Sequence, residues 1–314
     1  MWLAYLRLLR VPNVFTALAD VAAGFLLVHG APEPVITLAC LALASALLYT
    51  GGVVLNDVFD REVDAIERPE RPIPSGRVSW RAARALGYAL LVAGVVAGGA
   101  AGYCQPLAEA VPWRSGAVAV ALAACILAYD GWLKPTPAGP LAMGACRMFN
   151  VLLGMSTGVP TLTEWNLAGY GAYQLVVAGG IGVYIAGVTW FARTEARESR
   201  RWPLVLATAA MLGGVGLLAF LHRTLPFDRP PGLASEGTWM LLLALLAATI
   251  LRRCAVAVAH PAPAPVQMAV RHAILSLIVL DAAVVAEASD WRYGAGVLVL
   301  LVPALLVGRW IEST

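Results

Sequence analysis

The stretch VITLACLALASALLYTGGVVL, residues 35–55, contains no charged residue and is followed directly by the polar sequence NDVFDREVD, residues 56–64. An α-helix needs about 20 consecutive apolar residues to cross the hydrocarbon core of a bilayer. The apolar stretch is long enough for this, and we expect it to form a membrane-spanning helix that ends in a cluster of acidic residues.

The composition of the whole chain also indicates a membrane protein. Of its 314 residues, 60% are hydrophobic and only 13% are charged, whereas a soluble domain has about 25% charged residues. Uniformly apolar runs of this length exclude the tilted strands of a closed β-barrel, so we expect an all-α, polytopic membrane bundle of nine to ten transmembrane helices. The ten apolar segments lie near residues 13–30, 35–57, 82–104, 115–133, 138–158, 169–192, 203–221, 237–252, 266–287 and 293–310.

The basic residues are distributed unevenly between the two sides of this predicted bundle. Most of the 22 lysine and arginine residues lie in alternate loops, and the two richest loops, near residues 61–84 and 193–201, fall on the same side. By the positive-inside rule this side faces the cytoplasm. Topology alone accounts for these basic loops, so they do not indicate nucleic-acid binding. We expect a multi-pass protein of a bacterial inner membrane whose active site faces the cytoplasm.

The acidic cluster after the second apolar segment has the spacing of a metal site. If the helix continues, Asn56, Asp60 and Asp64 are four residues apart and share one face, while Asp57 points about 100° away. Carboxylate and amide oxygens suit Mg²⁺, which takes its remaining ligands from water and phosphate. The alternative is a solvated helix end with surface ion pairs.

An arginine-rich loop follows the acidic cluster. The sequence ERPERPIPSGRVS, residues 67–79, carries Arg68, Arg71 and Arg77 between prolines. Guanidinium groups bind phosphate oxygens through two parallel hydrogen bonds. Carboxylates and arginines that alternate at a membrane surface therefore indicate a site for a metal-bridged diphosphate.

A second polar cluster follows the sixth apolar segment. In GVTWFARTEARE, residues 187–198, Glu195 and Glu198 are three residues apart and can share a helix face. Arg193 and other arginines are mixed with these glutamates, which weakens the acidic signal. A basic membrane anchor explains the stretch equally well.

Several ionisable residues fall inside or beside the apolar segments. Asp20 lies seven residues after Asn13, on the same helix face, Arg147 precedes Asn150 by three residues, and Asp281 lies in the middle of the ninth segment. Such residues are functional candidates because charges are costly at membrane depth. A structural ion pair or an interhelical hydrogen bond is the alternative.

Two further polar residues flank the end of the fourth apolar segment. Tyr129 and Lys134 both lie where this helix leaves the membrane. Lys134 is placed either to touch a phosphate or to extend its ammonium group into the headgroup region.

Taken together, these motifs resemble the UbiA superfamily of intramembrane prenyltransferases. The resemblance covers about residues 5–200 and is carried by LRVPNVFTALAD (9–20), by NDVFDREVD with RPERPIPSGRVS (56–64 and 68–79) and by AYDGWLKPTPAGP (128–140). The stretches GGVVLNDVFD (51–60) and GVTWFARTEA (187–196) are most similar to the EboC-like branch of this superfamily.

The resemblance implies one prenyltransferase domain over residues 1–314, with about nine spans around a central cavity. It implies Mg²⁺-dependent transfer of an isoprenoid from its diphosphate donor to a small-molecule acceptor within the lipid bilayer. The expected residues are Asp57, Asp60 and Asp64 for catalysis; Asn56, Asp60, Asp64, Glu195 and Glu198 for the metal; and Asn13, Arg68, Arg71, Arg77, Tyr129, Lys134, Arg147, Asn150 and Arg193 for the substrate. We also expect Tyr184, Trp190 and Phe191 to stabilise an allylic cation.

One departure from the family pattern leaves other functions open. The second motif of the family carries aspartates four residues apart, and the matching residues 189–193 contain none. Either Glu195 and Glu198 take the second metal role, or Arg193 replaces a cation, or catalysis has changed. Besides the enzyme, we consider a non-catalytic transporter or lipid-binding scaffold that uses Asp20 and Asp281, and an isoprenoid cyclase. The intact first motif favours the enzyme.

Overall fold

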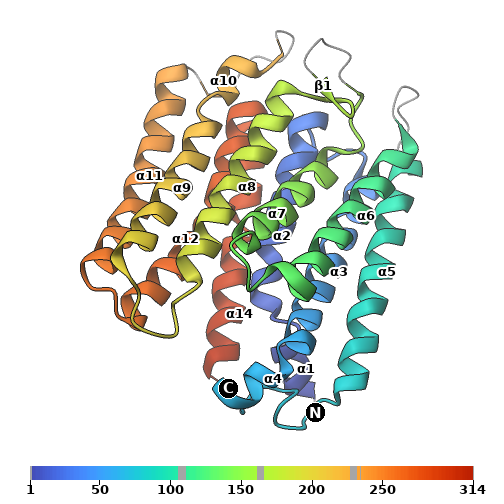
Figure 1. The fold of residues 1–314 in the computed structure, drawn as a ribbon. Helices are drawn as coiled ribbons and strands as arrows, with labels where there is room; N and C mark the ends of the chain where they lie inside the picture. Colours follow the sequence, from blue (N-terminus) through green and yellow to red (C-terminus); the bar gives the residue numbers. More distant parts are fainter. Residues whose placement is uncertain (1, 105–110, 161–165, 227–231, 234, 314) are drawn as a thin grey trace.

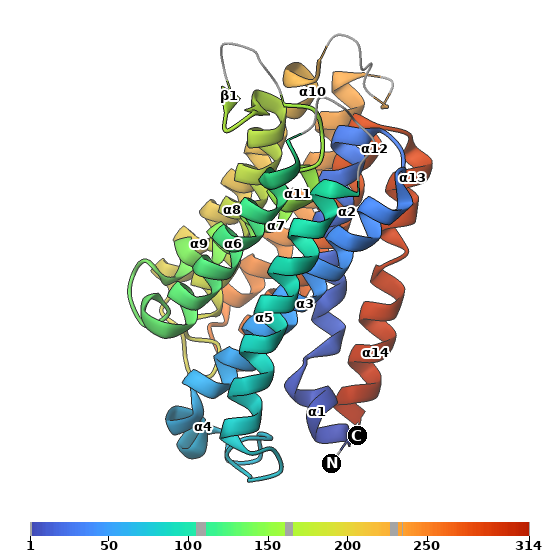
Figure 2. The ribbon, with the colours of Figure 1, turned by 90° about the vertical axis from the view of Figure 1, so that its right-hand side faces the viewer.

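A computed structural model describes residues 2–104, 111–160, 166–226, 232–233 and 235–313 as a bundle of long helices (Figures 1 and 2). The all-α prediction is confirmed, with one short two-stranded hairpin added. In chain order the elements are α1 (Trp2–Leu8), α2 (Val11–His29), α3 (Val35–Phe59), α4 (Arg61–Glu67), α5 (Trp80–Tyr103), α6 (Pro112–Ala128), the π-helical turn η1 (Tyr129–Leu133), α7 (Gly139–Met155), β1 (Asn166–Leu167), β2 (Tyr170–Gly171), α8 (Ala172–Ala192), α9 (Arg201–Leu218), α10 (Leu221–Thr224), α11 (Glu236–Ala259), α12 (Pro263–Ala288), α13 (Trp291–Leu298) and α14 (Leu301–Ser313).

Nine helical stretches of the described residues are long and apolar enough to cross a membrane. They correspond to nine of the ten predicted segments, and α13 with α14 counts as one of them, Trp291–Gly308. The remaining segment forms α7, whose 17 residues are slightly short of the usual span. The prediction of nine to ten spans and of a multi-pass membrane protein is therefore confirmed.

Local sequence signals set several helix ends. Ser79 caps α5 by accepting a hydrogen bond from the backbone N–H of Ala82. Gly30 closes α2 with a φ of 74°, in the left-handed region, and its N–H donates to the carbonyl of Leu26. These signals leave the long apolar interiors uninterrupted between polar ends.

Close contact between α2 and α7 depends on two glycines. A methyl group on Gly24 would collide with the carbonyl oxygen of Val151, and one on Gly154 would collide with that of Val21. Small residues let helix backbones approach closely in lipid. This contact brings the polar side chains of α2 and α7 to one another in the centre of the bundle.

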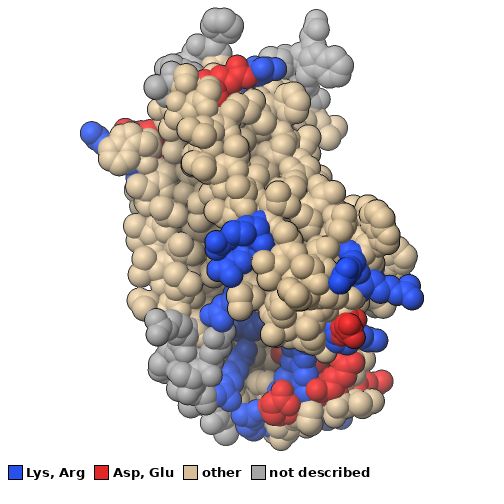
Figure 3. All heavy atoms as spheres, turned by 90° about the vertical axis from the view of Figure 1, so that its left-hand side faces the viewer, with Lys and Arg blue, Asp and Glu red and all other residues tan. Residues whose placement is uncertain are grey.

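Both ends of the chain lie at one end of the bundle, beside α4, and α10 with the β-hairpin lies at the other end (Figure 1). In the space-filling view of Figure 3, basic and acidic side chains gather around a hollow at the end that holds the termini, while most of the surface above is free of charge. The first arginine-rich loop and the residues after α8 both reach this end, as the positive-inside pattern predicts. The candidate site residues on these segments therefore lie at the same end of the bundle.

Candidate active site

A cavity of about 1010 Å³ lies between α2, α3, α6, α7, α8 and α12, near the end of the bundle that holds α4. Its polar lining contains Arg10, Asn13, Tyr49, Asn56, Asp60, Arg68, Arg71, Tyr129, Asp130, Lys134, Arg147, Asn150, Thr189, Arg193, Glu195 and Arg197. Its apolar lining includes Leu122, Ile126, Met143, Ile185, Val188, Val270 and Ile274. A cavity with anion-binding groups and an apolar wall suits an amphiphile with an acidic head.

The first acidic motif is divided by a break in the helix. Asn56 and Asp60 line the cavity, as their spacing predicts. At Asp60, however, ψ is 0°, so α3 ends at Phe59 and α4 leaves in another direction. Asp64 therefore does not share the face of Asn56 and Asp60, and its Oδ2 accepts a hydrogen bond of 2.6 Å from Arg71. Its metal and catalytic roles stay predictions.

Asp57 forms the centre of a buried ion-pair network beside the cavity. Its Oδ1 accepts hydrogen bonds from Arg10 Nη2 at 2.6 Å and from Arg71 Nη1 at 3.4 Å. Arg71 thus joins Asp57 to Asp64, and the network ties the start of α2 to the end of α3. Asp57 points away from Asn56 and Asp60, as predicted. The sequence did not single out Arg10, although it lies in the first-helix stretch that carried the resemblance.

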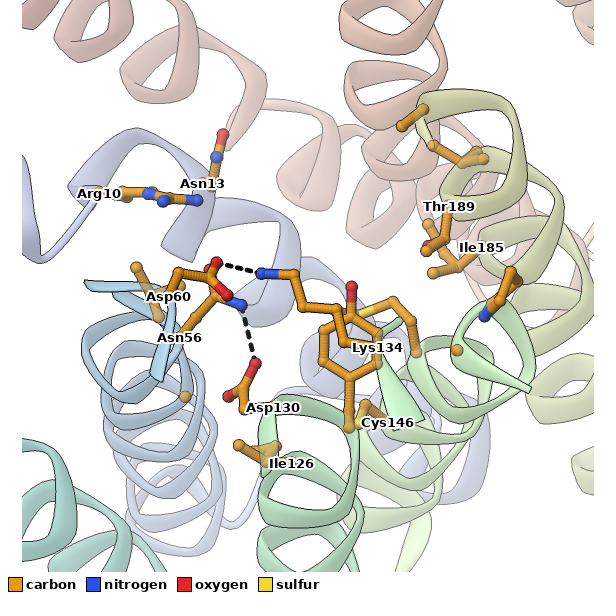
Figure 4. Close-up of a pocket in the computed structure, with 18 of the residues that line it drawn as sticks. Arg10, Asn13, Asn56, Asp60, Ile126, Asp130, Lys134, Cys146, Ile185 and Thr189 are labelled. Atoms are coloured by element: carbon orange, nitrogen blue, oxygen red, sulfur yellow. Dashed lines mark hydrogen bonds and ion pairs between the residues drawn. The ribbon is translucent and has the colours of Figure 1, made fainter. Parts of the chain in front are cut away.

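The π-helical turn η1 supplies a second group of cavity residues. The N–H of Lys134 donates to the carbonyl of Tyr129 five residues earlier, which defines the turn. Lys134 forms an ion pair with Asp60, and Asn56 Nδ2 donates to Asp130 Oδ1 at 2.9 Å (Figure 4). Tyr129 and Lys134 line the cavity, and substrate binding by them stays a prediction.

Asp130 is a cavity residue that the sequence reasoning missed. Its side chain is buried in the protein but faces the cavity. Asp130 lies between Tyr129 and Lys134, in a stretch whose sequence signal is its resemblance to the family motif. A regular α-helix gives no reason to single it out, and π-helical turns are common at functional sites.

The residues after α8 reach the cavity from the side opposite α3. Arg193, Glu195 and Arg197 line it, whereas Glu198 is exposed and does not. Arg193 Nη2 donates to the carbonyls of Pro135 and Thr136 at 3.0 and 2.9 Å, and so holds the loop after η1. Burial raises the pKa of Glu195, and the neighbouring Arg68 and Arg10 partly offset this effect.

The three arginines of the predicted phosphate loop have different positions. Arg68 and Arg71 line the cavity. Arg77 does not: its Nε donates to Ser75 Oγ at 2.9 Å and its Nη2 to the carbonyl of Glu70, so it braces the loop. Diphosphate binding by Arg77 stays a prediction.

A closed polar network lies deeper, where α2, α3 and α7 meet. Arg147 Nη1 donates to Asp20 Oδ2 at 2.8 Å, and Asn150 Nδ2 donates to the same oxygen at 3.0 Å. Ser45 Oγ donates to Asn150 Oδ1 at 2.8 Å. Asn13, Arg147 and Asn150 line the cavity, while Asp20 and Asp281 do not, and substrate binding by the first three stays a prediction. The carboxyl group of Asp281 is fully buried next to that of Asp20.

The aromatic residues expected to stabilise a cation lie outside the cavity. Tyr184 is buried and donates a hydrogen bond to the carbonyl of Ala273, and neither Trp190 nor Phe191 lines the cavity. Tyr49 and Tyr129 line it instead. The helical register of α8 turns its aromatic residues toward other neighbours, which the sequence alone did not reveal.

Known proteins resemble this chain in sequence and in fold. The digeranylgeranylglyceryl phosphate synthase of Ignicoccus hospitalis is 37% identical over 152 residues, which are 48% of this chain and 46% of that protein. The chain thus spans about half the length of such relatives or less. They are archaeal, so a bacterial inner membrane finds no support, and they leave the EboC-like branch as a prediction.

Solved structures share the arrangement of the helices. A structure of a digeranylgeranylglyceryl phosphate synthase in membranes has a TM-score of 0.62 at 19% identity, over 91% of this chain and 97% of that one. A UbiA homologue from Archaeoglobus fulgidus, bound to GPP and Mg²⁺, has a TM-score of 0.58 at 16% identity, over 94% and 99% of the two chains. At these identities the likeness shows the fold.

The sequence model of the UbiA prenyltransferase family matches residues 17–256, which include the helices around the cavity except the start of α2 and the whole of α12. The match covers more than half of the chain, and it agrees with the motifs at the ends of α3 and α6. The chain belongs to the UbiA prenyltransferase family.

Proposed function

We propose that this chain transfers an isoprenoid group from its diphosphate to a small-molecule acceptor in the membrane, in a reaction that requires Mg²⁺. The observation that carries the proposal is the single cavity that joins acidic and basic side chains to an apolar wall. The diphosphate binds among the charged residues, and the isoprenoid lies against the apolar wall. The family membership and the names of the relatives support the same reaction.

The residues at the end of α3 fit Mg²⁺. Asn56 and Asp60 offer amide and carboxylate oxygens to the cavity. The ammonium group of Lys134 pairs with Asp60 and shows that a cation is accommodated at this carboxylate. Mg²⁺ binds through one or two carboxylates and completes its shell with water and phosphate oxygens. When bound there, the ion neutralises charge on the leaving diphosphate and lowers the barrier to C–O cleavage.

The chain's own residues have distinct tasks in this proposal. Arg68, Arg71 and Lys134 hold diphosphate oxygens by charge-assisted hydrogen bonds. Arg193 supports this end by fixing the loop after η1. The apolar wall excludes water, so that the allylic cation reacts with the acceptor instead of being hydrolysed.

The acceptor binds nearer to the middle of the membrane, beside the polar residues of α2, α3 and α7. Asn13, Tyr49 and Arg147 line this part of the cavity and provide hydrogen-bond partners for a hydroxyl or a phosphate. The relatives are named digeranylgeranylglyceryl phosphate synthases. A prenylated glyceryl phosphate is therefore the first acceptor class that we propose to test.

The proposed site lies toward the end of the bundle that carries both termini and the basic loops. By the positive-inside rule this end faces the cytoplasm, where a water-soluble diphosphate donor is available. We propose that residues 1–314 act as one domain around this site.

The first experiment measures diphosphate release from geranyl, farnesyl and geranylgeranyl diphosphates by the purified protein, with and without Mg²⁺. Parallel reactions contain geranylgeranylglyceryl phosphate, an aromatic acid or a polyol, and mass spectrometry identifies any prenylated product. We expect Mg²⁺-dependent release and a prenylated acceptor. Cyclised hydrocarbon formed without an acceptor would identify a cyclase, and the absence of Mg²⁺-dependent donor binding would favour the transporter or scaffold.

A further inference from the structure

The charges that line the cavity are divided between two walls. The wall formed by α3 and η1 carries Asn56, Asp60 and Asp130, and these three lie together on one side of Figure 4. Across the cavity, the end of α8 carries Thr189, and the residues that follow include Arg193 and Arg197. The first wall therefore offers oxygen ligands, with Lys134 paired to Asp60, and the second offers guanidinium groups together with Glu195.

The three oxygen-bearing residues lie next to one another on this wall. Asn56 Nδ2 and Asp130 Oδ1 are 2.9 Å apart, and Asp60 lies four residues after Asn56, where it touches the ammonium group of Lys134. Asp130 is only 8% exposed and faces the cavity, so its charge is largely removed from water. A buried carboxylate requires a compensating positive charge. Two carboxylates and one amide oxygen form a donor set that Mg²⁺ accepts when phosphate and water complete it.

The opposite wall does not provide a comparable set of ligands. Within the described ranges, no three His, Cys, Asp or Glu side chains are close enough together to hold a metal ion. Glu195 therefore does not join Asp60 and Asp130 in one cluster, and Glu198 is outside the cavity. The basic residues near Glu195 are arginines, which bind phosphate oxygens directly and need no metal.

We propose that the cavity holds a single divalent cation on Asn56, Asp60 and Asp130, and that Arg193 and Arg197 take the place of a second cation at the diphosphate. Asp130 is thus a metal ligand contributed by the π-helical turn. The inference rests on the proposed function, because it assigns the residues that hold the donor's diphosphate.

The test counts bound metal ions directly. Mn²⁺ binding to the purified full-length protein is followed by electron paramagnetic resonance, with geranylgeranyl thiolodiphosphate as an unreactive donor analogue. We expect one Mn²⁺ per chain. Asp130→Asn keeps an acceptor for the hydrogen bond from Asn56, so the fold is retained, but Mn²⁺ affinity should fall about tenfold or more.

Two further variants test metal binding and diphosphate binding separately. Glu62→Gln is the matched acidic control, because Glu62 is exposed and pairs only with Arg61 within the described residues; its Mn²⁺ affinity should equal that of the wild type. Arg193→Ala should weaken analogue binding about tenfold while the count of Mn²⁺ stays at one. Unfolding temperatures of all variants identify any that fail to fold.

The outcomes distinguish this inference from the proposed function. Two Mn²⁺ ions per chain, or wild-type Mn²⁺ affinity in Asp130→Asn, would overturn the single-ion site. If binding requires Asp60 and not Asp130, only the inference falls and the transferase proposal stands. If the wild type binds the analogue equally well with and without Mn²⁺, both fall.

Discussion

Two acid–base pairs at different depths of the bundle show how the same chemistry serves different purposes. At the rim of the cavity, the side chains of Asp60 and Lys134 are 25% and 32% exposed. In the middle of the bundle, those of Asp20 and Arg147 are 0% and 11% exposed. We expect the more exposed rim pair to exchange partners with a ligand more readily than the deep pair, of which Arg147 alone lines the cavity.

The hydrogen bonds of the two pairs differ in the same way. Asp20 Oδ2 accepts from both Arg147 and Asn150, and Arg147 also donates to Thr16 at 2.8 Å. Within the described residues, the side chain of Asp60 forms one hydrogen-bonded ion pair, with the flexible amine of Lys134. We expect Asp20 with Arg147, the pair with more hydrogen bonds and less exposure, to matter more for stability, and Asp60 with Lys134 to matter more for binding.

The largest expected effect comes from Asp60→Ala at the rim. We expect diphosphate release to fall by about 10³-fold or more, because electrostatic stabilisation of the leaving group is lost. The unfolding temperature should stay near that of the wild type, since Lys134 is then free to contact water. Donor-release assays and thermal unfolding in detergent check this, with Glu62→Gln as control. Full activity of Asp60→Ala would refute the proposed site.

The matching change in the deep pair is Asp20→Asn. It removes the carboxylate that pairs with the buried charge of Arg147, and we expect unfolding to become easier by about 3 kcal/mol. Reversible unfolding in mixed detergents measures the difference. Glu236→Gln, which removes an exposed pair with Arg223, should change stability by less than about 0.5 kcal/mol. Equal effects of the two variants would contradict the distinction between deep and exposed pairs.

Lys134→Gln tests how far the rim pair takes part in binding. We expect the affinity for the diphosphate donor to fall about tenfold, with little change in unfolding temperature, because one charge-assisted phosphate contact is lost. Isothermal titration with the thiolodiphosphate analogue checks this. If the variant instead unfolds as readily as Asp20→Asn, the rim pair is also structural.

The smallest expected effect is the pH dependence set by Glu195. Burial raises the pKa of Glu195 above its ordinary value of 4.5, with Arg68 and Arg10 acting in the opposite direction. The folded protein therefore binds this proton more tightly than the unfolded chain, and stability falls as the pH rises from about 4.5 through the raised value. Glu195→Gln should match the wild type below pH 4.5 and unfold at a slightly higher temperature near pH 7. Thermal unfolding from pH 4 to 8 without added metal measures this; a lower unfolding temperature at pH 7 would show a stabilising carboxylate.

Composition and local spacing by themselves determined the membrane-spanning helices and the end of the bundle that gathers the charged motifs. These properties are local, because a helix of about twenty apolar residues is stable in the hydrocarbon core of the bilayer whichever helices it packs against. The i, i+4 spacing likewise placed Asn56 and Asp60 on one face, and the loop after them supplied Arg68 and Arg71.

The tertiary structure decided which of the candidate residues meet. The turn at Asp60 sends Asp64 to Arg71, the π-helical turn brings Asp130 to Asn56 across 74 residues of sequence, and the α2–α7 contact encloses Asp20 with Arg147. Helical periodicity cannot specify these long-range contacts, because they depend on the angles and depths at which separate helices pack. Which charged residues line the cavity and which pair inside the bundle is decided by that packing.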